Sequence, residues 1–334
     1  MKYTIATLAS HSCLQILKGA KDEGFETLAI ALSDRVNFYK RFKFIDKIVS
    51  IKSYSEFYKL EKNLAKEKVI FVPHGSITAY LGSDYAGKIK MSHFGNKNVL
   101  SWEIDREKQM EWLQKAGLKL PKIFKNPQEI SSPVIIKLFG AKGGSGYFLA
   151  KDKAEFLQKV KKFRREKYII QQYMVGTPVY LQYFYSPLKK EIELLGIDRR
   201  YESNVDGLSR LPPKIFDKFK SEPSFTVIGN FPIVIRESLL PEVYKMGEKI
   251  VAVSKKLISL KGLYGPFCLE TIVTPNQVFY AIEISCRIVA GTNLYINGSP
   301  YTDLQYGEPM STGRRIAVEI KEAIKQKRLG EILD

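Results

Sequence analysis

The sequence predicts a chain of mixed α/β and α+β class, with an N-terminal parallel α/β domain followed by two further lobes. Three observations support this prediction. Over roughly the first hundred residues, apolar strand-like segments alternate with helical segments, as in a parallel sheet. A glycine-rich turn near residue 140 then joins two short apolar segments, and longer strand-like segments follow from about residue 180. The 334 residues suffice for two or three domains of about 150 residues each.

The N-terminal domain is expected over residues 1–98. Residues 3–9 form a predicted buried strand, and the next helix begins near Ser10 and ends before Gly24. Because open parallel sheets bind ligands at the carboxyl ends of their strands, the residues that follow these strands are candidates for a binding site. The other elements expected here are strands at 25–32, 47–51 and 68–73 and a helix at 53–67.

The rest of the chain is expected to form a small lobe over residues 99–180 and a large lobe over residues 181–334. One long helix is predicted at 99–116, with Gly117 placed to end it. The small lobe follows a β-loop-β-α-β pattern, with strands at 133–137, 147–150 and 168–174 and a helix at 153–164. The large lobe is predicted to contain strands at 181–185, 191–197, 265–274 and 278–285 and a helix at 241–257.

The formal net charge of +18 is compatible with nucleic acid, a membrane surface or anionic small molecules as partners. Lysines and glutamates are interspersed along helical segments, so phosphorylated small molecules explain the charge as well as a polynucleotide does. No segment is apolar enough for a membrane span, and the first residues lack a signal-peptide pattern. The three cysteines form no CxxC pair, which predicts reduced thiols. We therefore expect a cytoplasmic protein that binds neither membrane nor nucleic acid.

A glycine-rich segment, Gly140–Gly146, joins two predicted strands. Its backbone N–H groups can close over phosphate oxygens, and Lys137 and Lys142 bring positive charge to the same place. The alternative is a simple hairpin turn with a surface lysine. A second segment, Gly82–Lys88, has the spacing of a P-loop, but Ile89 follows where a hydroxyl is needed, so we interpret it as a chance match.

Two glutamates lie within strongly apolar strands near the end of the chain. Glu270 ends the segment GPFCLE, Glu283 lies within FYAIEIS, and the two strands form an apparent hairpin. Adjacent buried carboxylates are costly unless they meet a cation, and magnesium takes oxygen ligands and bridges phosphates. The sequence therefore predicts a metal site at Glu270 and Glu283. The alternative is that each glutamate pairs with an arginine, with Arg287 the obvious partner.

Several long stretches carry more specific information, among them HFGNKNVLSWEIDR at 93–106, IIKLFGAKGGSGYFLAK at 135–151, ELLGIDRRYESNVDGL at 193–208 and EISCRIVAGTN at 283–293. Together with the order of lysine strand, glycine-rich hairpin and later glutamates, they resemble the archaeal-type PurP family of the ATP-grasp superfamily. The resemblance covers nearly the whole chain. It implies a two-lobed ATP-grasp fold after the N-terminal domain, with nucleotide held between the lobes.

The resemblance implies a ligase of de novo purine (IMP) biosynthesis that uses ATP and Mg²⁺ or Mn²⁺. In that reaction formate and 5-aminoimidazole-4-carboxamide ribonucleotide (AICAR) give the formylated ribonucleotide (FAICAR), ADP and phosphate, through formyl phosphate. Such catalysis depends on positioning and charge neutralisation, so no nucleophilic residue is expected. The family also implies a homo-oligomer. Another ATP-grasp carboxylate–amine ligase with a different acid or amine remains open, as does a non-enzymatic module that binds nucleic acid through the positive charge.

Residue roles follow from matching the family's motifs onto this sequence. For ATP phosphates they are Lys137, Gly140, Lys142, Gly143, Gly144 and Gly146, and for the adenosine part Gln171, Gln172, Tyr173, Met174 and Glu202. The metal would bind Glu270 and Glu283, while Ser285 stands where the family often has asparagine. Arg287 would stabilise the acyl phosphate. Candidates for the AICAR pocket are His11, Ser12, His74, Gly75, Ser76, Asn230 and Thr292. Alternatives are helix-cap or turn roles for His11, Ser76 and Asn230 and, for the histidines, a zinc site, although their spacing is unlike that of structural zinc ligands.

Overall fold

A computed structural model describes residues 3–82, 87–138, 146–163, 166–212, 214–215, 224 and 226–334 of the chain. Its N-terminal domain contains the predicted parallel sheet, with strand order β3-β2-β1-β4. The sheet is a continuous apolar layer, and Ala6, Leu28 and Ile30 are almost fully buried. Its elements are β1 (Thr4–Leu8), α1 (Cys13–Asp22), β2 (Glu26–Leu32), α2 (Val36–Tyr39), β3 (Lys47–Ile51), α3 (Phe57–Leu64), β4 (Val69–Phe71) and α4 (Ile77–Leu81).

The single helix predicted at 99–116 is wrong, because the structure has two helices there. They are α6 (Lys97–Ile104) and α7 (Arg106–Lys115), separated by Asp105 with extended backbone angles of φ −88° and ψ 109°. The Asp105 carboxylate accepts hydrogen bonds from the N–H groups of Glu107 and Lys108, so it starts a new helix instead of continuing the old one. An aspartate inside an apolar pattern therefore acted as an N-cap.

The small lobe is an antiparallel sheet with strand order β5-β8-β6-β7 and its own apolar cluster around Phe156. The predicted pattern of strands and helix in this lobe is confirmed. The glycine-rich loop is only partly described: Gly146 is included with a positive φ of 78°, whereas Gly140, Lys142, Gly143 and Gly144 lie outside the described residues. The elements are β5 (Ile123–Phe124), β6 (Val134–Leu138), β7 (Tyr147–Ala150), α8 (Lys153–Lys159) and β8 (Tyr168–Gln172).

The large lobe is built on an antiparallel sheet with strand order β11-β10-β9-β12-β13. Two of its strands are longer than the sequence predicted, since β9 and β10 continue through polar residues that pair with neighbouring strands. Helices α12 and α13 and strand β11 were not predicted. The elements are β9 (Thr177–Ser186), β10 (Glu191–Glu202), α9 (Ser203–Leu208), β11 (Val227–Pro232), α11 (Leu240–Leu257), β12 (Gly265–Val273), β13 (Phe279–Ser285), α12 (Pro300–Tyr306) and α13 (Thr312–Lys325).

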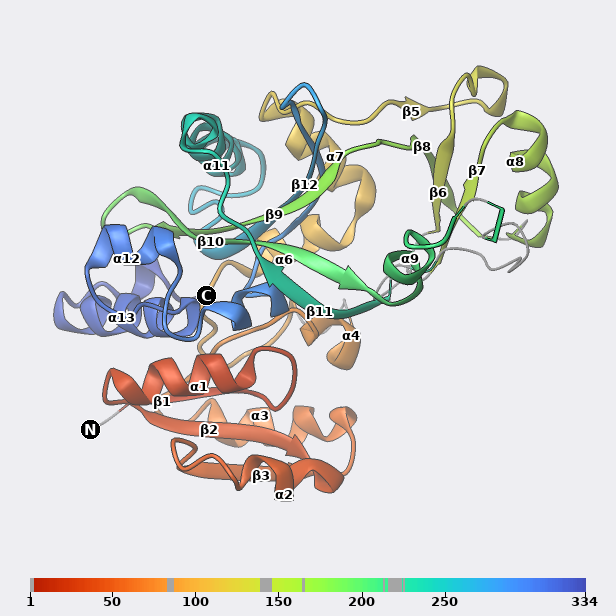
Figure 1. Cartoon of the computed structure of the whole chain (residues 1–334). Coiled ribbons are helices and arrows are strands. Elements are labelled where there is room, and N and C mark those ends of the chain that lie inside the picture. Colours follow the sequence, from red (N-terminus) through yellow and green to blue (C-terminus); the bar gives the residue numbers. More distant parts are fainter. Residues whose placement is uncertain are drawn as a thin grey trace.

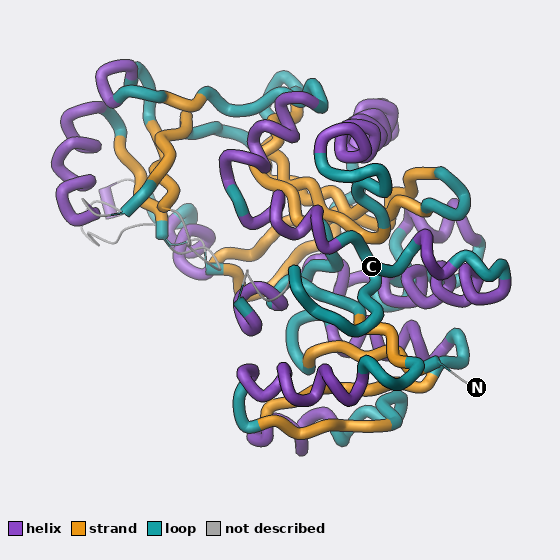
Figure 2. The backbone as a smooth tube through the Cα atoms, turned by 180° about the vertical axis from the view of Figure 1, so that it is seen from behind, coloured by secondary structure: helices purple, strands orange, loops and turns teal. Residues whose placement is uncertain are grey.

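The three parts pack around the large sheet, with the N-terminal domain below it and the small lobe to one side (Figure 1). Helix α7 belongs with the large sheet, because Trp112 Nε1 donates to the Ile250 carbonyl of α11 at 3.0 Å. Helix α13 lies against α1, where a Cβ on Gly19 would come within 2.1 Å of the Arg314 nitrogen. Figure 2 shows the same arrangement from behind. The boundaries at residues 98 and 180 stay a prediction, and the packing of α7 favours a start of the small lobe after Gly117. In the described parts of the chain, every helix falls short of the length or apolarity needed to cross a membrane.

Candidate active site

Two cavities meet between the three parts of the molecule. The first cavity, of about 360 Å³, is lined by residues of all three parts, and the second, of about 230 Å³, by the small lobe and the large lobe. Both cavities share one set of side chains, which we call the seam: Lys137, Tyr147, Tyr180, Arg200, Glu270 and Glu283. The seam is therefore where a molecule in one cavity can react with a molecule in the other.

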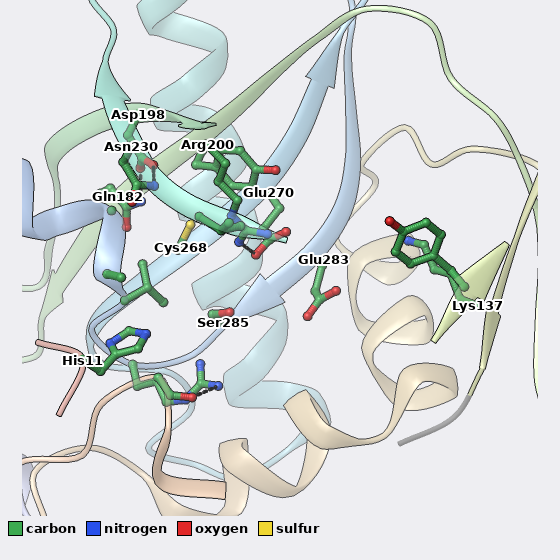
Figure 3. Close-up of a pocket in the computed structure, with 18 of the residues that line it drawn as sticks. His11, Lys137, Gln182, Asp198, Arg200, Asn230, Cys268, Glu270, Glu283 and Ser285 are labelled. Atoms are coloured by element: carbon green, nitrogen blue, oxygen red, sulfur yellow. Dashed lines mark hydrogen bonds and ion pairs between the residues drawn. The ribbon is translucent and has the colours of Figure 1, made fainter. Parts of the chain in front are cut away.

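The two strand glutamates lie side by side at the seam, as the sequence predicted. Glu270 on β12 and Glu283 on β13 are directly paired across the two antiparallel strands. Burial raises the pKa of Glu270, and the neighbouring Glu283 carboxylate raises it further, while Arg200 opposes both effects. Figure 3 shows the two carboxylates in the same cavity with Ser285 nearby. Such a pair gains stability from any cation that approaches it.

Two arginines contact these glutamates, although not the one that the sequence suggested. Arg200 forms an ion pair with Glu270 and stacks over the Tyr180 ring, 4.1 Å from its centroid. Arg106 lies 3.9 Å from Glu283. The proposed pairing of Arg287 with these glutamates is wrong, because its Nη1 lies 2.7 Å from Glu103 instead.

Lys137 faces the glutamate pair from the small lobe. It lies on β6 and lines both cavities, and β6 ends next to the glycine-rich loop, of which Gly146 also lines the first cavity. Desolvation by burial lowers the pKa of Lys137, and the charges of Glu283 and Glu270 counteract this. The side chain of this small-lobe strand and the carboxylates of the large sheet thus line the same two cavities, with Lys137 to one side of Glu283 (Figure 3).

The second cavity brings together the residues predicted for adenosine. Gln171, Gln172, Tyr173 and Met174 line it from β8 and the following link, and Glu202 lines it from the end of β10. Gln171 is 2% exposed, and its Nε2 has no hydrogen-bond partner among the described residues. Burial raises the pKa of the Glu202 carboxyl. A buried amide without a partner points to a ligand acceptor, because such a donor is costly when left unpaired.

The first cavity receives only part of the predicted AICAR set. Of the seven residues, His11, Gly75 and Asn230 line it, and so does Arg287, which was predicted for the acyl phosphate. The other four predicted residues lie outside the lining of both cavities, and their contact with substrate stays a prediction: Ser12, His74, Ser76 and Thr292. Thr292 Oγ1 donates to the Val289 carbonyl at 2.6 Å, so its hydroxyl supports the loop beside the cavity.

His11 and His74 form a stacked pair at the cavity wall. Their rings are 5.4 Å apart and nearly parallel. His74 Nε2 donates to the Leu8 carbonyl while its Nδ1 accepts from the Ser76 N–H, so this ring is neutral with a defined tautomer. Solvent reaches His11 through the cavity, yet desolvation, with contributions from His74 and Arg287, lowers its pKa to about 3. His11 is therefore a neutral hydrogen-bonding group near pH 7.

The sequence analysis missed four polar residues of the first cavity, namely Arg106, Gln182, Asp198 and Arg200. A usable signal existed for two of them. In a strand, alternate residues point to the same face, so Asp198, Arg200 and Glu202 share one face of β10. A prediction that extended this strand beyond Ile197 would have found them.

The glutamate pair fits a magnesium ion in its chemistry. Mg²⁺ is usually held by one or two carboxylates, with waters and substrate phosphates completing an octahedron. Over the described residues, no group of three or more His, Cys, Asp or Glu side chains is arranged to hold a metal. A site of two carboxylates would therefore take its remaining ligands from waters and phosphate oxygens.

Comparisons with known proteins agree with this geometry. Two family models match, "Domain of unknown function (DUF1297)" over residues 151–334 and "Protein of unknown function (DUF1246)" over residues 5–124. A Pyrococcus abyssi protein named 5-formaminoimidazole-4-carboxamide-1-(beta)-D-ribofuranosyl 5'-monophosphate synthetase is 50% identical over 98% of both chains. The Saccharolobus solfataricus protein of the same name is 47% identical over 98% of this chain and 99% of its own.

Solved structures show the same fold. The IMP biosynthesis protein PurP from Thermococcus kodakaraensis matches with a TM-score of 0.81 and 32% identity, covering 99% of this chain and 100% of that one. An N5-carboxyaminoimidazole synthetase from Staphylococcus aureus complexed with ADP has a TM-score of 0.65 at 14% identity, covering 89% of this chain and 74% of that one. The second likeness concerns the fold alone.

Proposed function

The chain belongs to the PurP family of 5-formaminoimidazole-4-carboxamide ribonucleotide synthetases, ligases with the ATP-grasp fold, and from this premise we propose that it formylates AICAR with ATP and formate. The products are FAICAR, ADP and phosphate, and the reaction belongs to purine (IMP) biosynthesis. The observation that carries the proposal is the seam, because the cavity that holds the residues predicted for adenosine and a second, polar cavity share the same lysine, arginine and carboxylates.

The chemistry requires activation of formate before the amine can react. A formate oxygen attacks the γ-phosphorus of ATP and displaces ADP, which gives formyl phosphate. The 5-amine of AICAR then attacks the formyl carbon, expels phosphate and loses a proton. Both steps move negative charge at the γ-phosphate, so fixed cations there lower the barrier.

Three cationic residues are suited to that charge. In this proposal Lys137 binds the ATP phosphates at the seam, and Arg200 holds the formate and then the acyl phosphate. Arg287 lines the first cavity, and its Nε has no hydrogen-bond partner in the described part of the chain, which leaves a donor for an anion. The role of Arg287 toward the acyl phosphate is thus supported by an unpaired donor on a side chain that lines the first cavity.

Glu270 and Glu283 would hold magnesium, or manganese, against the ATP phosphates. The ion supplies charge neutralisation at the transferred phosphoryl group when it is bound. No covalent catalysis by the protein is needed. Cys268 is the cysteine in the first cavity, and burial raises its pKa well above the ordinary value, which keeps the thiol protonated. The proposal also includes a cytoplasmic location and a homo-oligomeric state. These two points rest on the family alone.

ADP release tests the function directly. The purified chain is incubated with Mg-ATP and either formate, AICAR or both, and ADP and FAICAR are quantified. We expect release well above both single-substrate controls only with the full mixture. Release with another carboxylic acid, but not with formate, would instead identify a different carboxylate–amine ligase of the same fold.

A further inference from the structure

A cluster of three hydrogen-bonded side chains lies at one end of the first cavity. Asp198 on β10 is 1% exposed, and its neighbours come from the adjacent strands, Gln182 from β9 and Asn230 from β11. Gln182 Nε2 donates to Asp198 Oδ1 at 2.5 Å, and Asn230 Nδ2 donates to Asp198 Oδ2 at 2.7 Å. All three residues line the cavity, and Figure 3 shows them gathered there.

The carboxylate determines how both amides are turned. An ionised carboxylate only accepts hydrogen bonds, so each amide must present its NH₂ group to Asp198. The opposite orientation would place oxygen against oxygen at the same short distances. Burial raises the pKa of Asp198, but both amide hydrogen bonds and the charge of Arg200 favour the ionised form. The remaining polar atoms, Gln182 Oε1 and Asn230 Oδ1, are therefore acceptors.

The surrounding backbone holds Asp198 in place. A Cβ on Gly291 would come within 2.4 and 2.5 Å of the two Asp198 oxygens, so this glycine lets the loop pack directly on the carboxylate. Tyr295 of the same loop donates to the Ile197 carbonyl and packs on Gly196. The acceptors thus belong to a rigid, closely packed part of the large lobe.

The position of the cluster relative to the seam selects its ligand group. Asp198 and Arg200 are two residues apart on the same face of β10, which corresponds to roughly 7 Å along a strand. In the proposed reaction the 5-amine must reach the seam, and the neighbouring ring substituent, the 4-carboxamide, carries two N–H donors. Two neighbouring substituents of one ring, each with its hydrogen bond, bridge a distance of this order, so the amine can lie at the seam and the carboxamide at the cluster.

We propose that Asp198 is a positioning residue, which turns the Gln182 and Asn230 carbonyl oxygens toward the first cavity so that they accept hydrogen bonds from the substrate's carboxamide N–H groups. The inference rests on the proposed function and deepens it. The pair of acceptors selects an amide over a carboxylate at ring position 4, because a carboxylate brings only acceptors and leaves both protein oxygens unpaired.

Substrate selectivity tests this role. The wild type and Asp198→Asn are compared with AICAR and with the 4-carboxylate ribonucleotide, by ADP release with formate and Mg-ATP. In the variant, the NH₂ group of the new asparagine can face the amide of Gln182 or Asn230. That amide then presents its oxygen to the asparagine and its NH₂ group to the cavity. We expect KM for AICAR to rise about 10- to 100-fold, the usual size of a lost hydrogen-bond arrangement, and amide-over-carboxylate selectivity to fall at least about tenfold. KM for ATP should be unchanged.

Controls separate positioning from folding. Asp46→Asn alters a carboxylate that accepts two hydrogen bonds from Thr27 and one from Lys21 but lies outside both cavities, and it should leave all KM values unchanged. Gln182→Met removes one acceptor together with its hydrogen bond to Asp198, keeps the carboxylate and the Asn230 hydrogen bond, and carries the test if Asp198→Asn does not fold. Unchanged selectivity, or an equal loss for every substrate, would overturn the inference. Lack of turnover by the wild type with formate and AICAR would instead refute the proposed function.

Discussion

The two cavities differ in how they are built. The first collects polar side chains from distant parts of the sequence, such as His11, Asp198 and Arg287, around three domain surfaces. The second draws four consecutive residues, 171–174, from one strand and its link, and adds both apolar and charged neighbours from the large sheet. The first cavity therefore depends on how the N-terminal domain sits on the large lobe, whereas the second depends on the local conformation of one segment.

The seam is the exception, because its residues belong to both cavities. A change there should affect both substrates, while a change elsewhere should affect one. Measuring the KM of each substrate separately thus locates every residue within this scheme, and the variants below test it from the largest expected effect to the smallest.

Glu283→Gln should have the largest effect. It removes a negative charge from the seam while keeping the shape of the side chain, so we expect kcat to fall about 100- to 1,000-fold with the fold intact. Turnover is measured by ADP release over a range of Mg²⁺ concentrations, and folding by circular dichroism. The matched control is Glu191→Gln, an exposed glutamate at the start of β10 outside both cavities. Near-normal turnover of Glu283→Gln with magnesium would contradict its assignment to the metal.

Arg200→Met should rank second, with kcat reduced about 100-fold, comparable to the loss of one fixed charge at a reacting group. The variant also leaves Glu270 without its ion-pair partner. Arg200→Lys should recover only part of the rate, because lysine lacks the planar fork that binds a carboxylate or phosphate with two hydrogen bonds. Arg199→Met is the matched control, since this neighbour lies on the opposite face of β10 and outside both cavities. Equal effects at the two arginines would argue against a specific role for Arg200.

The glutamate pair and Arg200 also show what the sequence could and could not predict. Glu270 and Glu283 stand out because apolar residues surround them on two clear strands, and their pairing in the structure follows from the hairpin. Arg200 was missed because residues 198–202 are too polar to be recognised as a strand. Their strand conformation comes from pairing with β11, which lies some thirty residues further along the chain. Local preference was overridden there by tertiary contacts.

The same contrast applies to the fold. The parallel sheet, the small lobe and the late hairpin were predictable, since each repeats a short apolar pattern. The break at Asp105 was not, because the residue is polar but common within helices, and its cap is recognised only from its hydrogen bonds. Similarly, the close packing of α1 on α13 joins the two ends of the chain through Gly19 and Gly313, and neither glycine differs from others in the sequence.

Acid should lower the stability of the N-terminal domain, which lines the first cavity, before it lowers that of the small lobe. The chain has three histidines, all in the N-terminal domain, and burial lowers the pKa of His74 and His93 to about 4. Below the ordinary value of 6.5 the unfolded state binds protons that the folded state does not. Stability is therefore fully present above pH 6.5 and is lost as pH falls toward 4, by about 2 kcal/mol for each residue at pH 5.

Urea unfolding at pH 7.5 and pH 5 measures this loss. Between pH 7.5 and pH 5, the His93→Gln variant should lose less free energy of unfolding than the wild type does. The difference should be one histidine's contribution, about 2 kcal/mol. The small lobe contains no histidine and serves as the internal reference, followed by hydrogen exchange in β6 and β8. A pH-independent stability between 7.5 and 5 would show that the buried histidines do not titrate as described.

Gln171→Leu should have the smallest effect and the most local one. The Gln171 amide is buried beside the second cavity, and its Nε2 lacks a partner in the described structure, so the unliganded protein bears the cost of an unpaired donor. Leucine removes that cost while losing a hydrogen bond to the nucleotide. We expect KM for ATP to rise about tenfold, KM for AICAR to stay the same, and thermal stability to hold or increase.

This combination of results separates a ligand-binding role from a structural one. If Gln171 only supported the small lobe, its replacement would lower stability and leave KM for ATP unchanged. Gln128→Leu is the matched control, because this glutamine belongs to the same lobe and lies outside both cavities. A rise in KM for AICAR with Gln171→Leu would contradict the separation of the two cavities, since a residue outside the seam would then affect the substrate of the first cavity.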